Sequence, residues 1–189
     1  MADPDDDLRW RVLARTPVHD YRIFRSTTVR AAHPQTGAER DYTVLDTPDW
    51  VNVIALTPAD EIVLIRQYRH GADRVHIEIP GGMVDPGEDH GTAARRELAE
   101  ETGYTAAEWR HVGTVEPNPA IHNNRLYTWL ALDARPTTAT ELDAGEVITT
   151  FTVPLADATM MLRDGRIDHS LVVSAFAHLL LATGELRRP

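Results

Sequence analysis

The sequence contains no cysteine and no lysine, and none of its apolar runs approaches the length of a membrane-spanning helix. The lack of cysteine excludes disulfides, thiolate catalysis and cysteine-ligated zinc sites. Because there is also no signal-peptide pattern, we expect a cytoplasmic protein that does not bind membranes. All 19 basic residues are arginine. Arginine is therefore the only permanently charged side chain available to bind a phosphate, and its planar fork suits that task.

The chain is strongly acidic, with 29 Asp and Glu residues and a formal net charge of −10. This charge argues against nucleic acid as a partner, because the phosphate backbone would be repelled. An acidic protein that acts on an anionic substrate needs local cations, either bound metal or arginine. The nine histidines include no close pair joined by a suitable third ligand, which disfavours a zinc site.

The N-terminal quarter of the chain is expected to form a small sheet rather than a domain of its own. Residues 1–7 carry four Asp and little to bury, so we expect a disordered acidic tail. Residues 8–47 contain three segments rich in β-formers, at 9–15, 21–31 and 40–47, with breaks expected at Pro17 and at 33–37. Three short strands are marginal alone, so this antiparallel unit should pack on the main domain or on a second subunit.

Residues 48–186 are expected to form one α/β domain. Strands are predicted at 51–57, 61–69, 76–79, 109–115, 126–132 and 147–155, and helices at 89–102, 155–163 and 170–181. Polar loops are expected at 116–125 and 133–145. The last helix has a broad apolar face made by Leu171, Ala175, Phe176, His178, Leu179 and Leu180, in which we expect His178 to serve packing or an interface.

An acidic helix directly follows a glycine-rich turn and is the most informative part of the sequence. The turn holds Gly81 and Gly82, and the helix carries Glu97, Glu100 and Glu101 at positions i, i+3 and i+4. This spacing brings the three carboxylates onto one helix face, where they repel unless a cation lies among them. Carboxylates are hard ligands that suit Mg²⁺ or Mn²⁺ together with a phosphate-bearing substrate.

The stretch from Gly82 to Tyr104 resembles the Nudix box. The positions that carry the resemblance are Gly82, Glu88, Arg96, Glu97, Leu98, Glu100, Glu101, Gly103 and Tyr104. The resemblance implies a Nudix fold, an α/β/α sandwich with a mixed sheet, here preceded by the small N-terminal antiparallel unit. It also implies a divalent-metal-dependent hydrolase, with Mg²⁺ or Mn²⁺ as cofactor, that cleaves a nucleoside diphosphate linked to another moiety.

By similarity to this family, Glu97 and Glu101 are expected to bind metal directly, with Glu100 as a third ligand or a water holder. The carbonyl of Gly81 or Gly82 is expected to complete a site, since neither residue has a side chain in the way. These are the residues that we expect to supply the metal ligands.

Arg96 lies about 100° around the helix from Glu97. It therefore does not simply continue the metal-binding face, and we expect it to reach back to Glu88 and fix the loop against the helix.

The general base is expected on a loop beyond the box, as the resemblance to enzymes acting on ADP-ribose implies. Glu146 is the preferred residue because it follows Gly145 and precedes an apolar strand. Glu141, Asp143 and a box glutamate acting directly remain alternatives.

The substrate expectation also comes from resemblance. Pro119 stands fifteen residues after Tyr104, and segments 66–69 and 78–82 look like those of the ADP-ribose pyrophosphatase group. That group implies cleavage of ADP-ribose to AMP and ribose 5-phosphate, and a homodimer through the N-terminal strands. The segment 116–120 departs from the Ser-Pro-Gly often found there, which leaves room for other nucleotide sugars, dinucleotides or nucleoside triphosphates.

Several further residues are candidates for substrate binding. By resemblance, Arg69 is a candidate for binding phosphate or the terminal ribose, with an exposed arginine at a strand end as the alternative, and Glu78 is a candidate substrate-binding residue. Trp50 is a candidate for stacking on a base, with a place in the core or a dimer interface as the alternative. A polar loop at the site entrance would be formed by Asn118, His122, Asn123 and Asn124. A Nudix-fold sensor without turnover is the alternative from another class, but it would be expected to have lost the glutamates that are present here.

Overall fold

The computed structural model describes residues 5–184, which divide into two compact units. Within that range the first unit comprises residues 5–48 and 116–124, and the second comprises residues 49–115 and 125–184. Of the expected acidic tail, residues 1–4 lie outside the described residues, and Asp6–Leu8 forms a short 3₁₀ helix (η1). No helix among the described residues is both long and apolar enough to cross a membrane.

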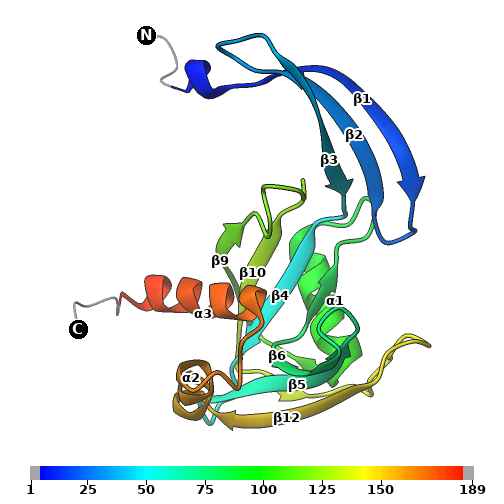
Figure 1. Ribbon diagram of the computed structural model, residues 1–189. Helices are drawn as coiled ribbons and strands as arrows, with labels where there is room; N and C mark the ends of the chain where they lie inside the picture. Colours follow the sequence, from blue (N-terminus) through cyan, green and yellow to red (C-terminus); the bar gives the residue numbers. More distant parts are fainter. Residues whose placement is uncertain (1–4, 185–189) are drawn as a thin grey trace. The chain divides into compact units, whose positions relative to one another are not determined.

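The first unit is a three-stranded antiparallel sheet in the order β1-β2-β3 (Figure 1). Its strands are β1 (Arg11–Asp20), β2 (Arg25–Ala32) and β3 (Glu39–Asp46). The central strand buries small residues, Val29, Ala31 and Ala32 among them. Segment 116–124 joins the unit through a hydrogen bond from the Leu45 N–H to the Ile121 carbonyl, 2.7 Å long.

The predicted break at Pro17 is wrong, because β1 continues through this residue to Asp20. Proline lacks the N–H that a central strand needs, but β1 is an edge strand and pairs only with β2. The register shifts between Pro17 and His19, as expected of a bulge that absorbs the missing donor. The chain reverses at the next turn, where the Tyr21 N–H donates to the Phe24 carbonyl.

The second unit contains nine strands in three sheets. The strands are β4 (Trp50–Ala55), β5 (Glu61–Arg69), β6 (Arg74–Glu78), β7 (Gly81–Met83), β8 (Tyr104–Thr105), β9 (Glu108–Val115), β10 (Leu126–Leu132), β11 (Arg135–Pro136) and β12 (Ile148–Pro154). They form a four-stranded sheet β7-β4-β10-β9, a three-stranded sheet β12-β5-β6 and a two-stranded sheet β11-β8. Strands β4 and β10 are parallel and the other pairs are antiparallel, so the four-stranded sheet is mixed.

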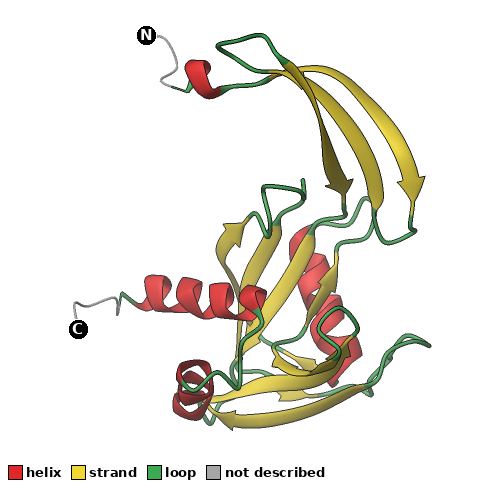
Figure 2. Ribbon diagram, in the orientation of Figure 1, coloured by secondary structure: helices red, strands yellow, loops and turns green. Residues whose placement is uncertain are grey.

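Three helices cover these sheets on opposite sides (Figure 2). They are α1 (His90–Thr102), α2 (Leu155–Arg163) and α3 (Ser170–Thr183). One core cluster contains residues of α1, with alternate residues of β4 such as Val53, and the other contains residues of α2 and α3, with Ile54. Adjacent strand residues point to opposite faces, so the sheet lies between the helices and the predicted α/β/α sandwich is confirmed.

The last helix differs from the prediction in its buried face. Helix α3 buries Val172, Ala175, Phe176 and Leu179, whereas Leu180 is 41% exposed. The predicted face was too wide, because a helix that packs on one side of a sheet leaves its far side uncovered.

Candidate active site

The glycine pair lies on β7, which pairs with β4. A Cβ atom added to Gly81 would stand 2.8 Å from the Cα of Asn52, so only glycine lets the two strands approach this closely. The Gly81 N–H is thereby free to point at α1 and donates to Glu101 Oε2 over 2.8 Å. The glycine strand and the acidic helix are thus joined at a buried carboxylate, whose residue is 3% exposed.

Gly82 leaves space for the carboxylate of Glu97. A Cβ atom added to Gly82 would stand 2.6 Å from the Cδ of Glu97, so the missing side chain provides the space for this carboxylate. The helix is fixed at both ends, because Asp89 Oδ1 accepts from the N–H of Gly91 at 2.9 Å and Gly103 ends the helix with a φ of 73°. These caps set which face of α1 turns toward β7.

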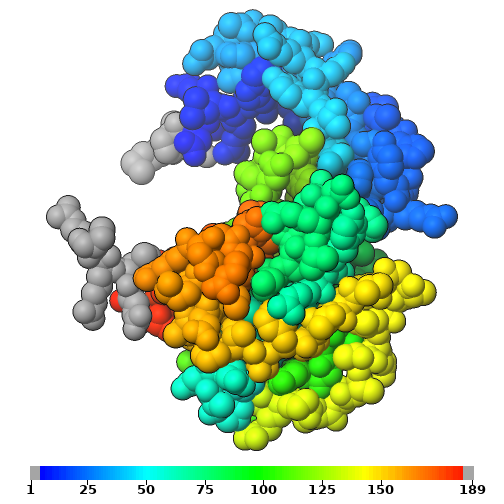
Figure 3. Space-filling model, turned by 60° about the horizontal axis from the view of Figure 1, so that its bottom comes forward, coloured from blue at the N-terminus to red at the C-terminus, as the bar shows by residue number. Residues whose placement is uncertain are grey.

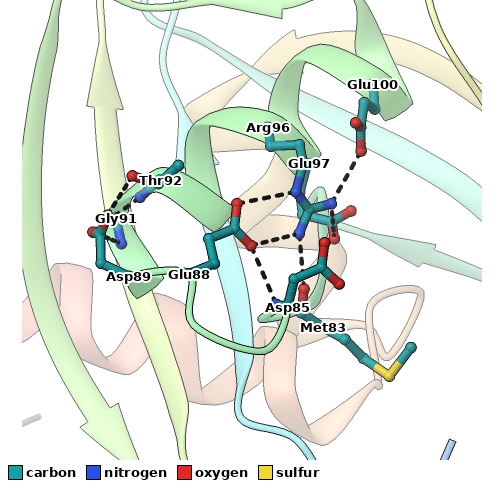
Figure 4. Close-up of polar contacts among 9 residues, drawn as sticks. All are labelled: Met83, Asp85, Glu88, Asp89, Gly91, Thr92, Arg96, Glu97 and Glu100. Atoms are coloured by element: carbon teal, nitrogen blue, oxygen red, sulfur yellow. Dashed lines mark hydrogen bonds and ion pairs between the residues drawn. The ribbon is translucent and has the colours of Figure 1, made fainter.

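Arg96 connects the loop and the acidic face of α1 (Figure 4). Its Nη2 donates to Glu88 Oε2 at 3.0 Å and to the Met83 carbonyl at 3.0 Å. Its Nη1 donates to Glu97 Oε1 at 2.9 Å and to Glu100 Oε2 at 3.1 Å. The predicted contact with Glu88 is present. Sequence reasoning missed the contacts of Arg96 with Glu97, Glu100 and Met83. Among these, the contact with Glu100 had a signal in the i, i+4 spacing of the two residues.

Burial disfavours the ionised forms of two glutamates of the box helix, Glu97 and Glu101. Burial raises the pKa of Glu97 to about 7, although Arg96 acts in the opposite direction. Burial also raises the pKa of Glu101 to about 8, against the hydrogen bond from Gly81. The pKa of Glu88 is instead lowered, chiefly by its hydrogen bonds with Arg96. The site therefore concentrates more negative charge than its own arginine offsets.

The chemistry of these donors fits a hard divalent cation. Glu97 and Glu101 offer oxygen donors in a poorly solvated place, and a bound cation would favour their ionised forms. No three His, Asp or Glu side chains in residues 5–184 already converge on one metal-sized point. The hydrogen bonds explain this arrangement, because Arg96 holds Glu97 and Glu100 while Gly81 holds Glu101.

Arg69 and Glu78 form a further charged pair in this unit. Arg69 donates from Nε and Nη2 to the two carboxylate oxygens of Glu78, each over 2.7 Å, and the Glu78 side chain is only 4% exposed. The hydrogen bonds to Glu78 raise the pKa of Arg69, and the charges of Glu101 and Glu146 add to this effect. The Arg69 guanidinium therefore lies within electrostatic reach of the acidic face of α1.

Glu146 lies in the loop between β11 and β12, which is drawn in yellow on the visible surface of Figure 3. Its N–H donates to the Asp143 carbonyl at 2.9 Å, and its Oε2 accepts from the Asp143 N–H at 3.1 Å. The charge of Glu146 raises the pKa of both Glu97 and Glu101. The side chain expected to act as base is therefore electrostatically coupled to the box.

Glu141 is held differently in the same loop. Its N–H donates to the Glu100 carbonyl at 2.9 Å, which attaches the loop to the C-terminal end of α1.

The remaining predicted residues fall in two places. Trp50 is half-buried at the start of β4, in the second unit. Pro119 lies in segment 116–124 of the first unit, with the polar loop residues Asn118, His122, Asn123 and Asn124. Asn123 and Asn124 attach this segment to the end of β3 and to Pro48, through hydrogen bonds of 2.7 Å to Asp46 and 3.0 Å to the Pro48 carbonyl.

Comparison with known proteins agrees with this geometry. Residues 47–176 match the NUDIX domain family. The chain is 31% identical over 135 residues to the methanol dehydrogenase activator of Bacillus methanolicus, and 30% identical over 135 residues to an ADP-ribose pyrophosphatase of Bacillus subtilis, each match covering 71% of this chain and 73% of the relative. A crystal structure of an ADP compounds hydrolase superposes with a TM-score of 0.81 at 25% identity, covering 94% of this chain and 97% of that one.

The family match extends well beyond the box and includes the glycine strand, the acidic helix and the loop that carries Glu146. The chain therefore belongs to the NUDIX domain family and is a Nudix pyrophosphohydrolase.

Proposed function

We propose that the protein hydrolyses ADP-ribose to AMP and ribose 5-phosphate in a reaction that depends on Mg²⁺ or Mn²⁺. The observation that carries this proposal is a pair of carboxylates, half-buried Glu97 and buried Glu101, held against two consecutive glycines of β7. The ADP-ribose pyrophosphatase and ADP compounds hydrolase among the matched proteins favour this substrate class.

Glu97 and Glu101 would hold the metal, with Glu100 and the carbonyl of Gly81 as further donors. The bound metal supplies charge neutralisation on the diphosphate oxygens and lowers the pKa of the attacking water. Arg96 keeps Glu97 and Glu100 oriented, and Glu88 keeps Arg96 oriented. The box residues thus prepare the site before substrate arrives.

Glu146 would take the proton from the attacking water. Its place on a surface loop suits a residue that closes over bound substrate, and its charge already acts on both box carboxylates. Arg69, oriented by Glu78, would bind a phosphate or the terminal ribose. Trp50 is proposed to stack on the base, and Pro119 remains a predicted substrate-binding residue.

The protein would act as a homodimer through the strands of the first unit. Strand β1 is exposed along its whole length, and its apolar side chains Val12 and Val18 are 48% and 64% exposed. An edge strand with exposed apolar side chains favours pairing with a second chain.

A substrate panel tests the proposal. ADP-ribose, other nucleoside-diphosphate sugars, a dinucleotide and a nucleoside triphosphate are incubated with Mg²⁺, and the release of AMP and phosphate esters is measured. We expect ADP-ribose to give the highest kcat/KM, and AMP with ribose 5-phosphate as its only products. If another compound gives the highest kcat/KM, the protein is still a hydrolase but ADP-ribose is not its substrate. If no diphosphate is hydrolysed, the result favours a ligand sensor.

A further inference from the structure

Three polar side chains lie in one row between α3 and the four-stranded sheet, and we call them the α3 seam: Asn52, Thr128 and His178. Asn52 on β4 pairs directly with Thr128 on β10, and Thr128 pairs with Gly113 on β9. Paired residues on neighbouring strands project from the same face of a sheet. The His178 ring takes the space in which a side chain at Gly113 would lie, so the third position of the row is filled from α3.

Helix α3 runs along this row, across the strands (Figure 1). Its first turn lies at Asn52, whose Nδ2 donates to the Leu171 carbonyl at 3.0 Å. His178 follows seven residues later, which corresponds to about 10.5 Å along a helix. Two strand spacings amount to about 9.6 Å. Because the helix length and the strand spacing agree, α3 covers the row from Asn52 to His178.

Each member of the seam has a buried polar atom without a partner. Asn52 Oδ1, Thr128 Oγ1 and His178 Nε2 have no hydrogen-bond partner among residues 5–184. Asn52 is 6% exposed and Thr128 is fully buried, while the neighbours on the same face, Ile54 and Leu130, are apolar core residues. Buried polar atoms are normally satisfied by protein or by ordered water, so this row requires a ligand that can donate and accept.

The polar character continues to the start of α3. His76 is 7% exposed and its Nε2 also lacks a partner among the described residues, as does Nδ1 of His169, the residue before the helix. The two rings are 5.9 Å apart, and His76 Nδ1 lies 3.1 Å from Asp168 Oδ1. Because the Asp168 side chain is 36% exposed, this end of α3 reaches the surface.

We propose that the α3 seam is a binding site for a row of ordered water molecules that bridge Asn52, Thr128 and His178. Neighbouring strands are about 4.8 Å apart, which is close to the span of one water with two hydrogen bonds of about 2.8 Å. The row contains no Asp, Glu or Arg side chain, which suits water better than a phosphate or a divalent cation. The water connects His178 of α3 to Asn52, the strand neighbour of Gly81.

Substitution of Thr128 by valine distinguishes a hydrated seam from a dry one by the sign of the change in Tm. If water is bound, Thr128→Val removes one of its partners and lowers the Tm by about 2–4 °C. If the seam is dry, the same change removes an unsatisfied hydroxyl and raises the Tm. The control is Thr159→Val on α2. The Thr159 hydroxyl donates to the Leu155 carbonyl of its own helix at 3.0 Å, and its loss should change the Tm of the protein less than Thr128→Val does.

A crystal structure of the unaltered protein at about 1.5 Å resolution or better provides the second test, and it applies even if the variant fails to fold. We expect water density within hydrogen-bond distance of at least two of the three seam atoms. A seam without density, or a Tm that rises in Thr128→Val, would overturn the proposal. Because neither measurement involves catalysis, failure here leaves the proposed hydrolase activity unaffected.

Discussion

The carboxylate of Glu97 lies in the space that a side chain on Gly82 would need. Glu97 and Gly82 are fifteen positions apart in the sequence. The lack of a side chain at Gly82 nevertheless determines where the Glu97 carboxylate lies. Gly82→Ala should therefore displace the Glu97 carboxylate while leaving the backbone in place, because the far end of a flexible side chain is what must move.

For Gly82→Ala we expect kcat with Mg²⁺ to fall by roughly 10-fold or more, with a small change in Tm. The measurements are steady-state kinetics over a Mg²⁺ titration and thermal unfolding. Gly71→Ala is the matched control, since an added methyl group there meets nothing within 4 Å. Unchanged kinetics in Gly82→Ala would show that this placement of Glu97 is not needed for turnover.

Glu101→Gln should separate charge from packing. The amide oxygen can still accept from the Gly81 N–H, so the fold should persist. The metal-free Tm at neutral pH should change little, because burial raises the pKa of Glu101 to about 8 and its carboxyl is already mostly neutral there. Turnover should fall about 10²-fold or more because a metal ligand is weakened. Glu108→Gln, on the exposed part of β9, is the control. Near-normal turnover would exclude Glu101 from the metal site.

The raised pKa values predict that Mg²⁺ stabilises the protein more at pH 8 than at pH 6. Folding raises the pKa of Glu97 to about 7 and that of Glu101 to about 8, from 4.5. Their contribution to stability is therefore fully present below about pH 4.5 and is lost as the pH rises through 7 and 8. A divalent cation binds the ionised forms, so its effect should grow over the same window.

The increase in Tm caused by a fixed Mg²⁺ concentration, measured between pH 6 and pH 8, tests this prediction. Glu101→Gln should reduce the pH dependence, because one of the two titrating groups is gone. An increase in Tm that is equal at both pH values would contradict the assignment of these carboxylates as ligands.

Glu146→Gln should retain metal binding and lose rate. The side chain lies on the loop rather than on α1, so metal affinity measured by titration should be almost unchanged, while kcat should fall about 10²-fold if Glu146 is the base. Glu141→Gln is the control from the same loop, whose backbone rather than side chain contacts α1. If Glu141→Gln lowers kcat and Glu146→Gln does not, Glu141 rather than Glu146 is the general base.

The box helix and its cap were predictable because each rests on local sequence. Asp89 and Gly103 are ordinary signals for the start and the end of a helix, and the structure begins α1 at His90 and ends it at Thr102. The contact between Arg96 and Glu88 was also predictable, since both belong to the same motif. Local spacing was sufficient for these features.

Features that depend on strand pairing were not predictable. The course of β1 through Pro17 depends on its place at the sheet edge. The row from Asn52 to Thr128 depends on the register of two strands more than 70 residues apart. The hydrogen bond from Arg96 to the Met83 carbonyl depends on a backbone group, which side-chain patterns do not report.

Arg96 keeps a positive charge among the box carboxylates at all times, because its guanidinium contacts Glu88, Glu97 and Glu100 without any metal. Departure of the metal should therefore leave α1 intact, unlike in small domains that unfold on chelation. An arriving cation competes with a resident guanidinium for the same oxygens. If these carboxylates are the metal ligands, metal uptake would be an exchange of partners within a finished fold, and chelation should be fully reversible.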